Sequence, residues 1–198
     1  MRHSMFARRA LVAAAALAIV PTMAAAQVAD SSHVPKVGQQ APDFSGPAST
    51  RYGFLRDQLH LSDLKGKTVV LAFFPKSRTQ GCTVQMEAYR DRYEKLFAGG
   101  KGVVVVSISA DADTTQQSWA RDANFPMVFV SDSSGAIGRT YGVFIPKYHI
   151  DNRVAFVLSP DGKITYRAMP FKELTEGAYG ELASAVANAT HATSAGTH

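Results

Sequence analysis

Strands and helices alternate through the middle of the chain, and this order limits the fold more than any other feature. The run from Thr68 to Phe74 is rich in β-branched and aromatic residues and ends at Pro75, which is typical of a buried strand. Apolar residues at helical spacing then predict a helix over residues 82–98. Further strands are predicted at 102–109, 127–130, 153–159 and 163–168, and helices at 113–123, near 135–141 and at 173–189, after an N-terminal hairpin region. The pattern predicts an α/β fold with a central mixed sheet flanked by helices.

The first 26 residues have the pattern of a signal peptide. Arg2, Arg8 and Arg9 form a basic segment, an apolar run follows at residues 10–20, and Ala24–Ala26 form a cleavage site of small residues. The apolar run is too short to span a bilayer. The pair Arg8–Arg9 leaves both twin-arginine and general secretory export open. We therefore expect a bacterial periplasmic or secreted protein whose mature chain begins at Gln27.

The leader also affects how the charge of the chain is interpreted. The net charge is +5, and removing the three leader arginines leaves +2. The sequence has neither a basic run interleaved with aromatic residues, as nucleic-acid binding requires, nor a basic amphipathic helix for a membrane surface. The six histidines lack metal-ligand spacing, so we expect no metal and no cofactor.

The mature chain of about 170 residues suits one domain with a sizeable core. We place this domain at residues 37–190. A flexible segment is predicted at 27–36 and a disordered tail rich in Ala, Thr, Ser and His at 191–198.

Cys82 is the only cysteine, and it lies at the start of the helix predicted after the strand 68–74. Unpaired N–H groups and the helix dipole at such a position favour a thiolate, which is the nucleophilic form of cysteine. Even a nearly complete shift to thiolate would raise the reactive fraction by only about thirtyfold, so catalysis would need further donors aimed at a leaving group. Without such donors, a lone cysteine is more often a small buried hydrophobic residue.

Pro75, Thr79 and Cys82 have the spacing P-x-x-x-T-x-x-C, which resembles the active-site loop of the peroxiredoxins. The string from Phe74 to Gln85 is most similar to the Q-type, or bacterioferritin-comigratory, subfamily. Other segments occur in the family's order, at 38–44, 61–67, 105–111, 125–126, 131–132 and 153–164. The resemblance covers about residues 35–175. It implies a thioredoxin fold of the peroxiredoxin type.

The resemblance implies a role for each residue of the loop. Cys82 would attack a peroxide oxygen and become a sulfenic acid, while Pro75 would shield the pocket from water. Thr79 would offer its hydroxyl to the peroxide and the sulfur, and Arg153 would hold the thiolate and the developing oxyanion. An arginine fork suits this role because its donors are fixed and always charged. Taken singly, Thr79 could be an ordinary helix N-cap and Arg153 a charge on a surface strand.

One position departs from the family's pattern. Many Q-type relatives carry a second, resolving cysteine five residues after the first, where this chain has Glu87. The resemblance therefore implies a one-cysteine peroxidase that reduces hydrogen peroxide and small organic hydroperoxides. Its sulfenic acid would be reduced by an external thiol or a thioredoxin-like protein, and a homodimer is compatible with the sequence.

The surroundings of Cys82 carry three further expectations. Basic residues nearby in the sequence are expected to support the thiolate: Lys76, Arg78, Arg90 and Arg92. Gln85 is expected on the helix surface, and Trp119 in the core.

Three classes of function remain open at this point. The first is a thiol peroxidase. The second is a disulfide oxidoreductase, which the lack of a C-x-x-C motif disfavours. The third is a redox-sensing or binding module on the same fold, which would need neither Thr79 nor Arg153.

Overall fold

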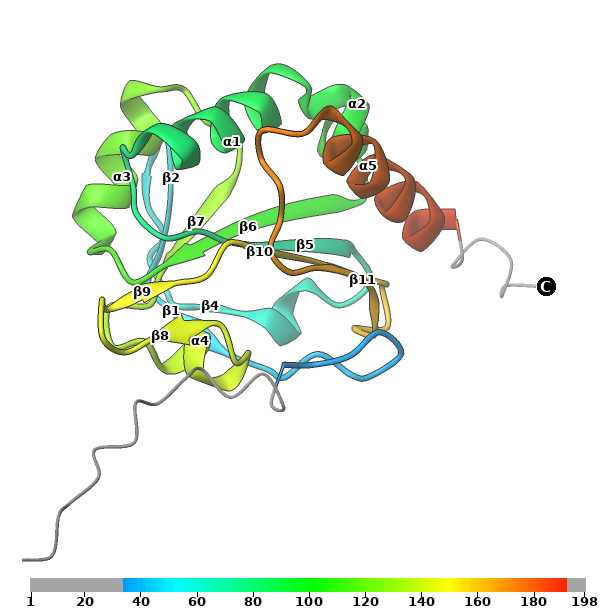
Figure 1. The fold of residues 1–198 in the computed structure, drawn as a ribbon, viewed down its shortest axis with the longest axis horizontal. Coiled ribbons are helices and arrows are strands. Elements are labelled where there is room, and N and C mark those ends of the chain that lie inside the picture. Colours follow the sequence, from blue (N-terminus) through cyan, green and yellow to red (C-terminus); the bar gives the residue numbers. More distant parts are fainter. Residues whose placement is uncertain (1–33, 192–198) are drawn as a thin grey trace, which may run out of the picture.

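The chain is built around a seven-stranded mixed sheet (Figure 1). The computed structural model describes residues 34–191. Strands β5, β6 and β7 run parallel, whereas β10, β11, β2 and β3 join the sheet antiparallel. In sheet order the strands are β11 (Ile164–Ala168), β10 (Val154–Leu158), β5 (Thr68–Phe73), β6 (Val103–Ser109), β7 (Val128–Ser131), β2 (Ala48–Thr50) and β3 (Gly53–Phe54).

Helices cover both faces of this sheet. One face carries α1 (Gln80–Asp91), α2 (Tyr93–Phe97), α3 (Asp113–Asp122) and α5 (Glu176–His191). The other face carries α4 (Ala136–Thr140) and the 3-10 helix η2 (Leu61–Leu64). The remaining elements are the 3-10 turn η3 (Ala98–Gly100) and two small sheets, made by β1 (Ser45–Gly46) with β4 (Leu59–His60) and by β8 (Phe144–Ile145) with β9 (Ile150–Asp151).

The sequence of β5 explains why the sheet is covered twice. Successive side chains of a strand point to opposite faces. Val70 and Ala72 therefore join a core cluster under α1, α3 and α5, whereas Val69 and Leu71 join a second cluster under η2 and α4. Every residue of β5 is buried, as a central strand with helices on both sides requires. Cys82 belongs to the first cluster.

Most predicted elements are confirmed to within one or two residues. The helix predicted at 173–189 is shifted, because α5 begins three residues later, at Glu176, and ends at His191. The helix expected at 82–98 differs in two respects. It begins earlier, at Gln80, and it is interrupted at Arg92, whose backbone leaves helical geometry (φ −114°, ψ 21°). After the interruption, α2 buries Leu96 and Phe97 in the core. The hairpin of β8 and β9 was not predicted. The predicted leader lies outside the described residues. So do residues 27–33 of the predicted flexible segment and residues 192–198 of the predicted tail.

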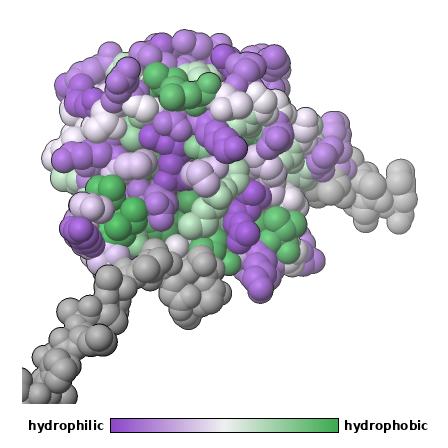
Figure 2. Space-filling view, viewed as in Figure 1, coloured by the Kyte–Doolittle hydropathy of each residue, from purple (hydrophilic) through white to green (hydrophobic). Residues whose placement is uncertain are grey.

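The surface seen in Figure 2 is mostly hydrophilic, with small hydrophobic patches separated by polar groups. Single exposed apolar residues of this kind are normal on a folded protein. Among the described helices, none is long and apolar enough to cross a membrane.

An uncompensated acid lies in the β8–β9 hairpin, two residues before Arg153. Asp151 is fully buried, and within the described chain neither of its carboxylate oxygens has a hydrogen-bond partner. Burial, reinforced by the charges of Asp132 and Asp111, raises the pKa of Asp151 to about 8. The protonated acid is therefore the form that the fold favours at neutral pH.

We expect this acid to make the protein less stable as the pH rises. A folded-state pKa above the ordinary value of 3.8 means that stability is full below about pH 4 and is lost as the pH rises to about 8. Between pH 5 and pH 8 the free energy of unfolding should fall by on the order of 2–4 kcal/mol through this group. Asp151→Asn should remove most of that fall in urea unfolding, whereas Asp57→Asn, at an exposed position, should retain it. Equal slopes in wild type and Asp151→Asn would contradict the assignment.

Candidate active site

The loop between β5 and α1 is held in place by the neighbouring β6–α3 unit. The Ser77 N–H donates to the Asp111 carboxylate at 2.6 Å, just beyond the end of β6. Arg78 adopts a left-handed backbone conformation (φ 63°), and its guanidinium pairs with Asp122 of α3 at 2.6 Å. The loop that precedes Cys82 is thus anchored on two successive residues.

Cys82 lies in the first turn of α1, and its side chain is completely buried. The first turn is closed by the Thr83 N–H, which donates to the Thr79 carbonyl at 2.8 Å. Backbone N–H groups at the start of a helix have no partner within the helix, and they favour negative charge near them. The structure therefore confirms the expected placement of the thiol at a helix start.

Arg153, immediately before β10, brings its guanidinium to the thiol. Its Nη2 donates to Cys82 Sγ at 3.5 Å, and its Nη1 donates to Gln85 Oε1 at 2.5 Å. Its third nitrogen, Nε, lies 3.2 Å from Glu173 Oε2. Only 12% of the Arg153 side chain is exposed. Arg153 is therefore not a free charge on a surface strand. The fold brings it to Cys82 from 71 positions away in the chain.

Thr79 occupies the N-cap position of α1, but its hydroxyl makes no capping hydrogen bond. Instead, Oγ1 donates to the Lys76 carbonyl at 2.8 Å, and the side chain is exposed. With its proton held in this way, the oxygen still has lone pairs that could accept a hydrogen bond from a hydroperoxide. Pro75 is half-buried at the start of the same loop. Pro75 and Thr79 thus lie on the loop before α1, Cys82 in the first turn of α1, and Arg153 just before the neighbouring strand β10.

Gln85 is where the sequence interpretation was wrong. It is fully buried rather than on the helix surface, and its amide links the site to the core. Oε1 accepts from Arg153, while Nε2 donates to Tyr89 Oη at 3.1 Å. Burial raises the pKa of Tyr89, so this phenol stays neutral. Helical spacing could have revealed the arrangement, because residues three apart from Cys82 share its helix face.

The charges around Cys82 are fewer than the sequence suggested. Arg78 pairs with Asp122, Arg90 with Asp91 at 2.7 Å, and Arg92 with Glu176 at 2.6 Å. Three of the four basic neighbours are therefore engaged by carboxylates on the surface. Arg153, distant in sequence, is the cation that contacts the sulfur. Trp119 is confirmed as a core residue, with its ring packed against Phe125 and Phe129.

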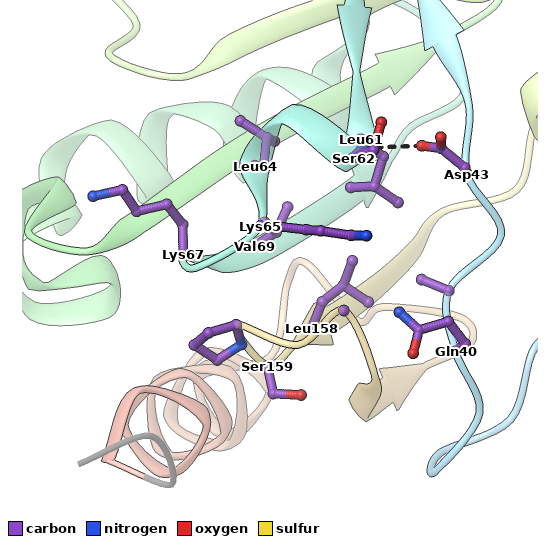
Figure 3. Close-up of a pocket in the computed structure, with 13 residues that line it drawn as sticks. Gln40, Asp43, Leu61, Ser62, Leu64, Lys65, Lys67, Val69, Leu158 and Ser159 are labelled. Atoms are coloured by element: carbon purple, nitrogen blue, oxygen red, sulfur yellow. Dashed lines mark hydrogen bonds between the residues drawn. The ribbon is translucent and has the colours of Figure 1, made fainter. Parts of the chain in front are cut away.

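A separate cavity of about 180 Å³ lies at the other end of strand β5 (Figure 3). It opens beside Val69 and Leu158, whereas Cys82 follows the opposite end of β5. In Figure 3 the Lys65 side chain extends across this cavity, and the Ser62 N–H donates to Asp43 at its rim. None of Pro75, Thr79, Cys82 and Arg153 lines it. The candidate active site is therefore defined by the thiol and its donors rather than by this cavity.

Comparison with known proteins decides the family. The model of the AhpC/TSA family matches residues 37–167, which include the whole loop, Cys82 and Arg153. The chain belongs to this family of peroxiredoxins. It is thus a thiol-dependent peroxidase, which implies a hydroperoxide as substrate and a thiol as reductant. Of the three function classes, the first is confirmed.

Individual relatives agree with this assignment. A putative peroxiredoxin bcp of Coxiella burnetii is 35% identical over 136 residues, which are 66% of this chain and 85% of the relative. Peroxiredoxin Bcp of Escherichia coli is 32% identical over 143 residues, 69% of this chain and 87% of the relative. The chloroplastic peroxiredoxin Q of Populus jackii is 34% identical, over 64% of this chain and 57% of the relative. The predicted resemblance to Q-type proteins is confirmed.

Solved structures confirm the thioredoxin-like fold of this peroxiredoxin. Peroxidoxin BcpB of Mycobacterium tuberculosis superimposes with a TM-score of 0.66 at 24% identity, over 78% of this chain and 97% of BcpB. AhpC of Enterococcus faecalis gives a TM-score of 0.70 at 20% identity, over 83% and 98% of the two chains. Within residues 34–191, no group of three or more His, Cys, Asp or Glu side chains is arranged to hold a metal ion.

Proposed function

We propose that this peroxiredoxin uses a one-cysteine mechanism in which Cys82 is the peroxidatic residue. The contact between Arg153 and Cys82 Sγ is the observation that carries the proposal. The thiolate attacks one oxygen of a hydroperoxide, an S–O bond forms, and the O–O bond breaks. Sulfur loses two electrons and becomes a sulfenic acid, while the second oxygen leaves as water or an alcohol after taking up a proton.

In this proposal Arg153 and Thr79 act on the transition state. The guanidinium contacts the sulfur and offers a fixed charge to the oxygen that becomes anionic as the O–O bond breaks. The Thr79 hydroxyl oxygen accepts a hydrogen bond from the hydroperoxide, which orients the attacked oxygen toward Cys82. Pro75, half-buried at the mouth of the loop, limits access of water. The substrates proposed are hydrogen peroxide and small organic hydroperoxides.

The lack of a second cysteine determines how the cycle closes. An external thiol attacks the sulfenic sulfur and releases water, which leaves a mixed disulfide on Cys82. A second external thiol then frees Cys82 and carries away the disulfide. We propose a low-molecular-weight thiol or a thioredoxin-like protein as reductant. Both would act after export.

We propose a periplasmic or secreted location on the basis of the predicted leader at residues 1–26. Cell fractionation that finds the chain in the cytoplasm would contradict this location.

The mechanism predicts that the sulfenic acid persists when no reductant is present. After one equivalent of hydrogen peroxide, intact-mass spectrometry should show the mass of one added oxygen, and dimedone should trap it at Cys82. Excess peroxide should add a second oxygen and inactivate the enzyme, because the sulfinic acid is not reduced by thiols. Rapid and complete conversion to a disulfide-linked dimer, with no oxygen adduct, would overturn the one-cysteine mechanism.

A further inference from the structure

Glu173 touches the guanidinium that contacts the thiol. Its Oε2 lies 3.2 Å from Arg153 Nε, and only 20% of the Glu173 side chain is exposed. Arg153 thus binds Glu173 through one nitrogen and Cys82 through another. A partly buried ion pair of this kind is screened by water much less than a surface pair.

The segment between β11 and α5 is fixed so that it delivers this carboxylate. The Phe171 N–H donates to the Arg153 carbonyl at 2.9 Å, and the buried Phe171 ring packs against Tyr89 and Tyr179. Two residues later, the Glu173 carbonyl accepts from Tyr179 Oη at 2.7 Å. The backbone around Glu173 is therefore held from two sides, by Arg153 just before β10 and by the Tyr179 hydroxyl of α5.

The start of α1 leaves room for the pair. A Cβ atom added at Gly81 would lie 2.7 Å from Glu173 Oε1 and 3.0 Å from Arg153 Nη2. Both distances are too short for normal packing, so the two side chains lie directly against the backbone that precedes Cys82. Glu173 thus brings a negative charge to the same helix start that favours a thiolate.

We propose that Glu173 is a positioning residue that orients Arg153 and, through its charge, limits the fraction of Cys82 present as thiolate. The inference rests on the proposed roles of Cys82 and Arg153. The carboxylate fixes the guanidinium from its Nε edge, which leaves Nη2 directed at the sulfur. The same carboxylate shares the positive charge with Cys82, so less of that charge is available to the thiolate. Orientation and charge can be separated, because glutamine keeps an oxygen that can accept from Nε but carries no charge.

Other titratable groups lie on the elements packed against the site. From the loop before α1, Lys76 is exposed and Arg78 pairs with Asp122. From α1, the neutral Tyr89 phenol is linked to Gln85. From α5, Tyr179 is neutral at physiological pH, because burial raises its pKa to about 12. Arg92 and Glu176 form their own ion pair beside Tyr179. Arg153 and Glu173 are thus the charged side chains that the structure places directly against the start of α1 at Gly81.

The test compares Glu173→Gln, Glu173→Ala and wild type in two assays. Alkylation of Cys82 with iodoacetamide over a range of pH reports the thiolate fraction without any peroxide. In Glu173→Gln the profile should move to lower pH, so that the alkylation rate at pH 6 rises about three- to tenfold. The rate of the stopped-flow reaction with hydrogen peroxide at pH 9, where thiolate is abundant, reports how well Arg153 is oriented. At that pH the rate constant of Glu173→Gln with peroxide should stay within about threefold of the wild-type value. The rate constant of Glu173→Ala should be lower by about tenfold or more.

Glu176→Gln is the matched control, since it removes an exposed carboxylate three residues away that pairs with Arg92. It should change neither assay. The proposal is overturned if Glu173→Gln alkylates as wild type does, or if Glu173→Ala keeps the wild-type rate with peroxide. Should wild type itself fail to react with peroxide, the proposed function falls, and the alkylation profiles alone then decide the effect of Glu173 on the thiol.

Discussion

Cys82→Ser is expected to abolish peroxidase turnover, leaving only the uncatalysed reaction of the supplied thiol with peroxide. Serine keeps the shape of the side chain in its fully buried position, but its hydroxyl is far less acidic and cannot cycle through a sulfenic acid. Because the chain has one cysteine, no other thiol can take over. Peroxide consumption by the purified protein with dithiothreitol as reductant measures the effect.

The control for this variant is its stability. The site loses one sulfur atom and no hydrogen bond other than the 3.5 Å contact with Arg153, so thermal unfolding should remain cooperative. A folded Cys82→Ser protein that still turns over peroxide would rule out Cys82 as the nucleophile and, with it, the proposed mechanism.

Arg153→Met should lower the second-order rate constant with peroxide by about 10²- to 10³-fold, as should Thr79→Val. Loss of the guanidinium removes the donor that contacts the sulfur, whereas loss of the Thr79 hydroxyl removes the acceptor proposed to orient the peroxide. Stopped-flow measurement under single-turnover conditions separates this step from reduction of the sulfenic acid. Cys82 should stay alkylatable in both variants, since neither substitution removes the thiol.

Arg56→Met serves as the control for arginine removal. Arg56 is exposed and lies outside the loop, α1 and the segment that holds Arg153, so the rate constant of this variant with peroxide should equal that of wild type. Near-normal rates in both Arg153→Met and Thr79→Val would show that the family's roles do not transfer to these positions.

The sequence predicts the fold well because its signals are local and repeated. In β5 every residue is apolar or β-branched, Pro75 ends the run, and the following polar–apolar spacing continues as a helix. The β8–β9 hairpin escaped prediction because its strands have two residues each, too few for any periodicity. The interruption at Arg92 escaped for a related reason, since α1 and α2 carry apolar residues at spacings that fit one continuous helix.

The site is predictable only in the part that the loop motif carries. Pro75, Thr79 and Cys82 lie within eight residues, and Arg153 follows from the resemblance. Glu173 could not be inferred in this way, because its place depends on how Phe171 anchors the segment beside Arg153. Helical spacing places Gln85 on the face of Cys82, but its hydrogen bond with Arg153 spans 68 positions and likewise could not be inferred. Contacts over such separations arise from tertiary packing, which local patterns do not encode.

The anchoring of the loop on Asp111 and Asp122 matters because the proposed substrates, hydrogen peroxide above all, are so small. Hydrogen peroxide has two non-hydrogen atoms, and a ligand of that size gains at most about 3 kcal/mol on binding. Ordering the five residues from Pro75 to Thr79 would cost about 5–10 kcal/mol of conformational entropy. Peroxide therefore cannot induce the fit of its own pocket. The ion pair and the amide contact made during folding supply that order in advance, so that each encounter meets a site already shaped for reaction.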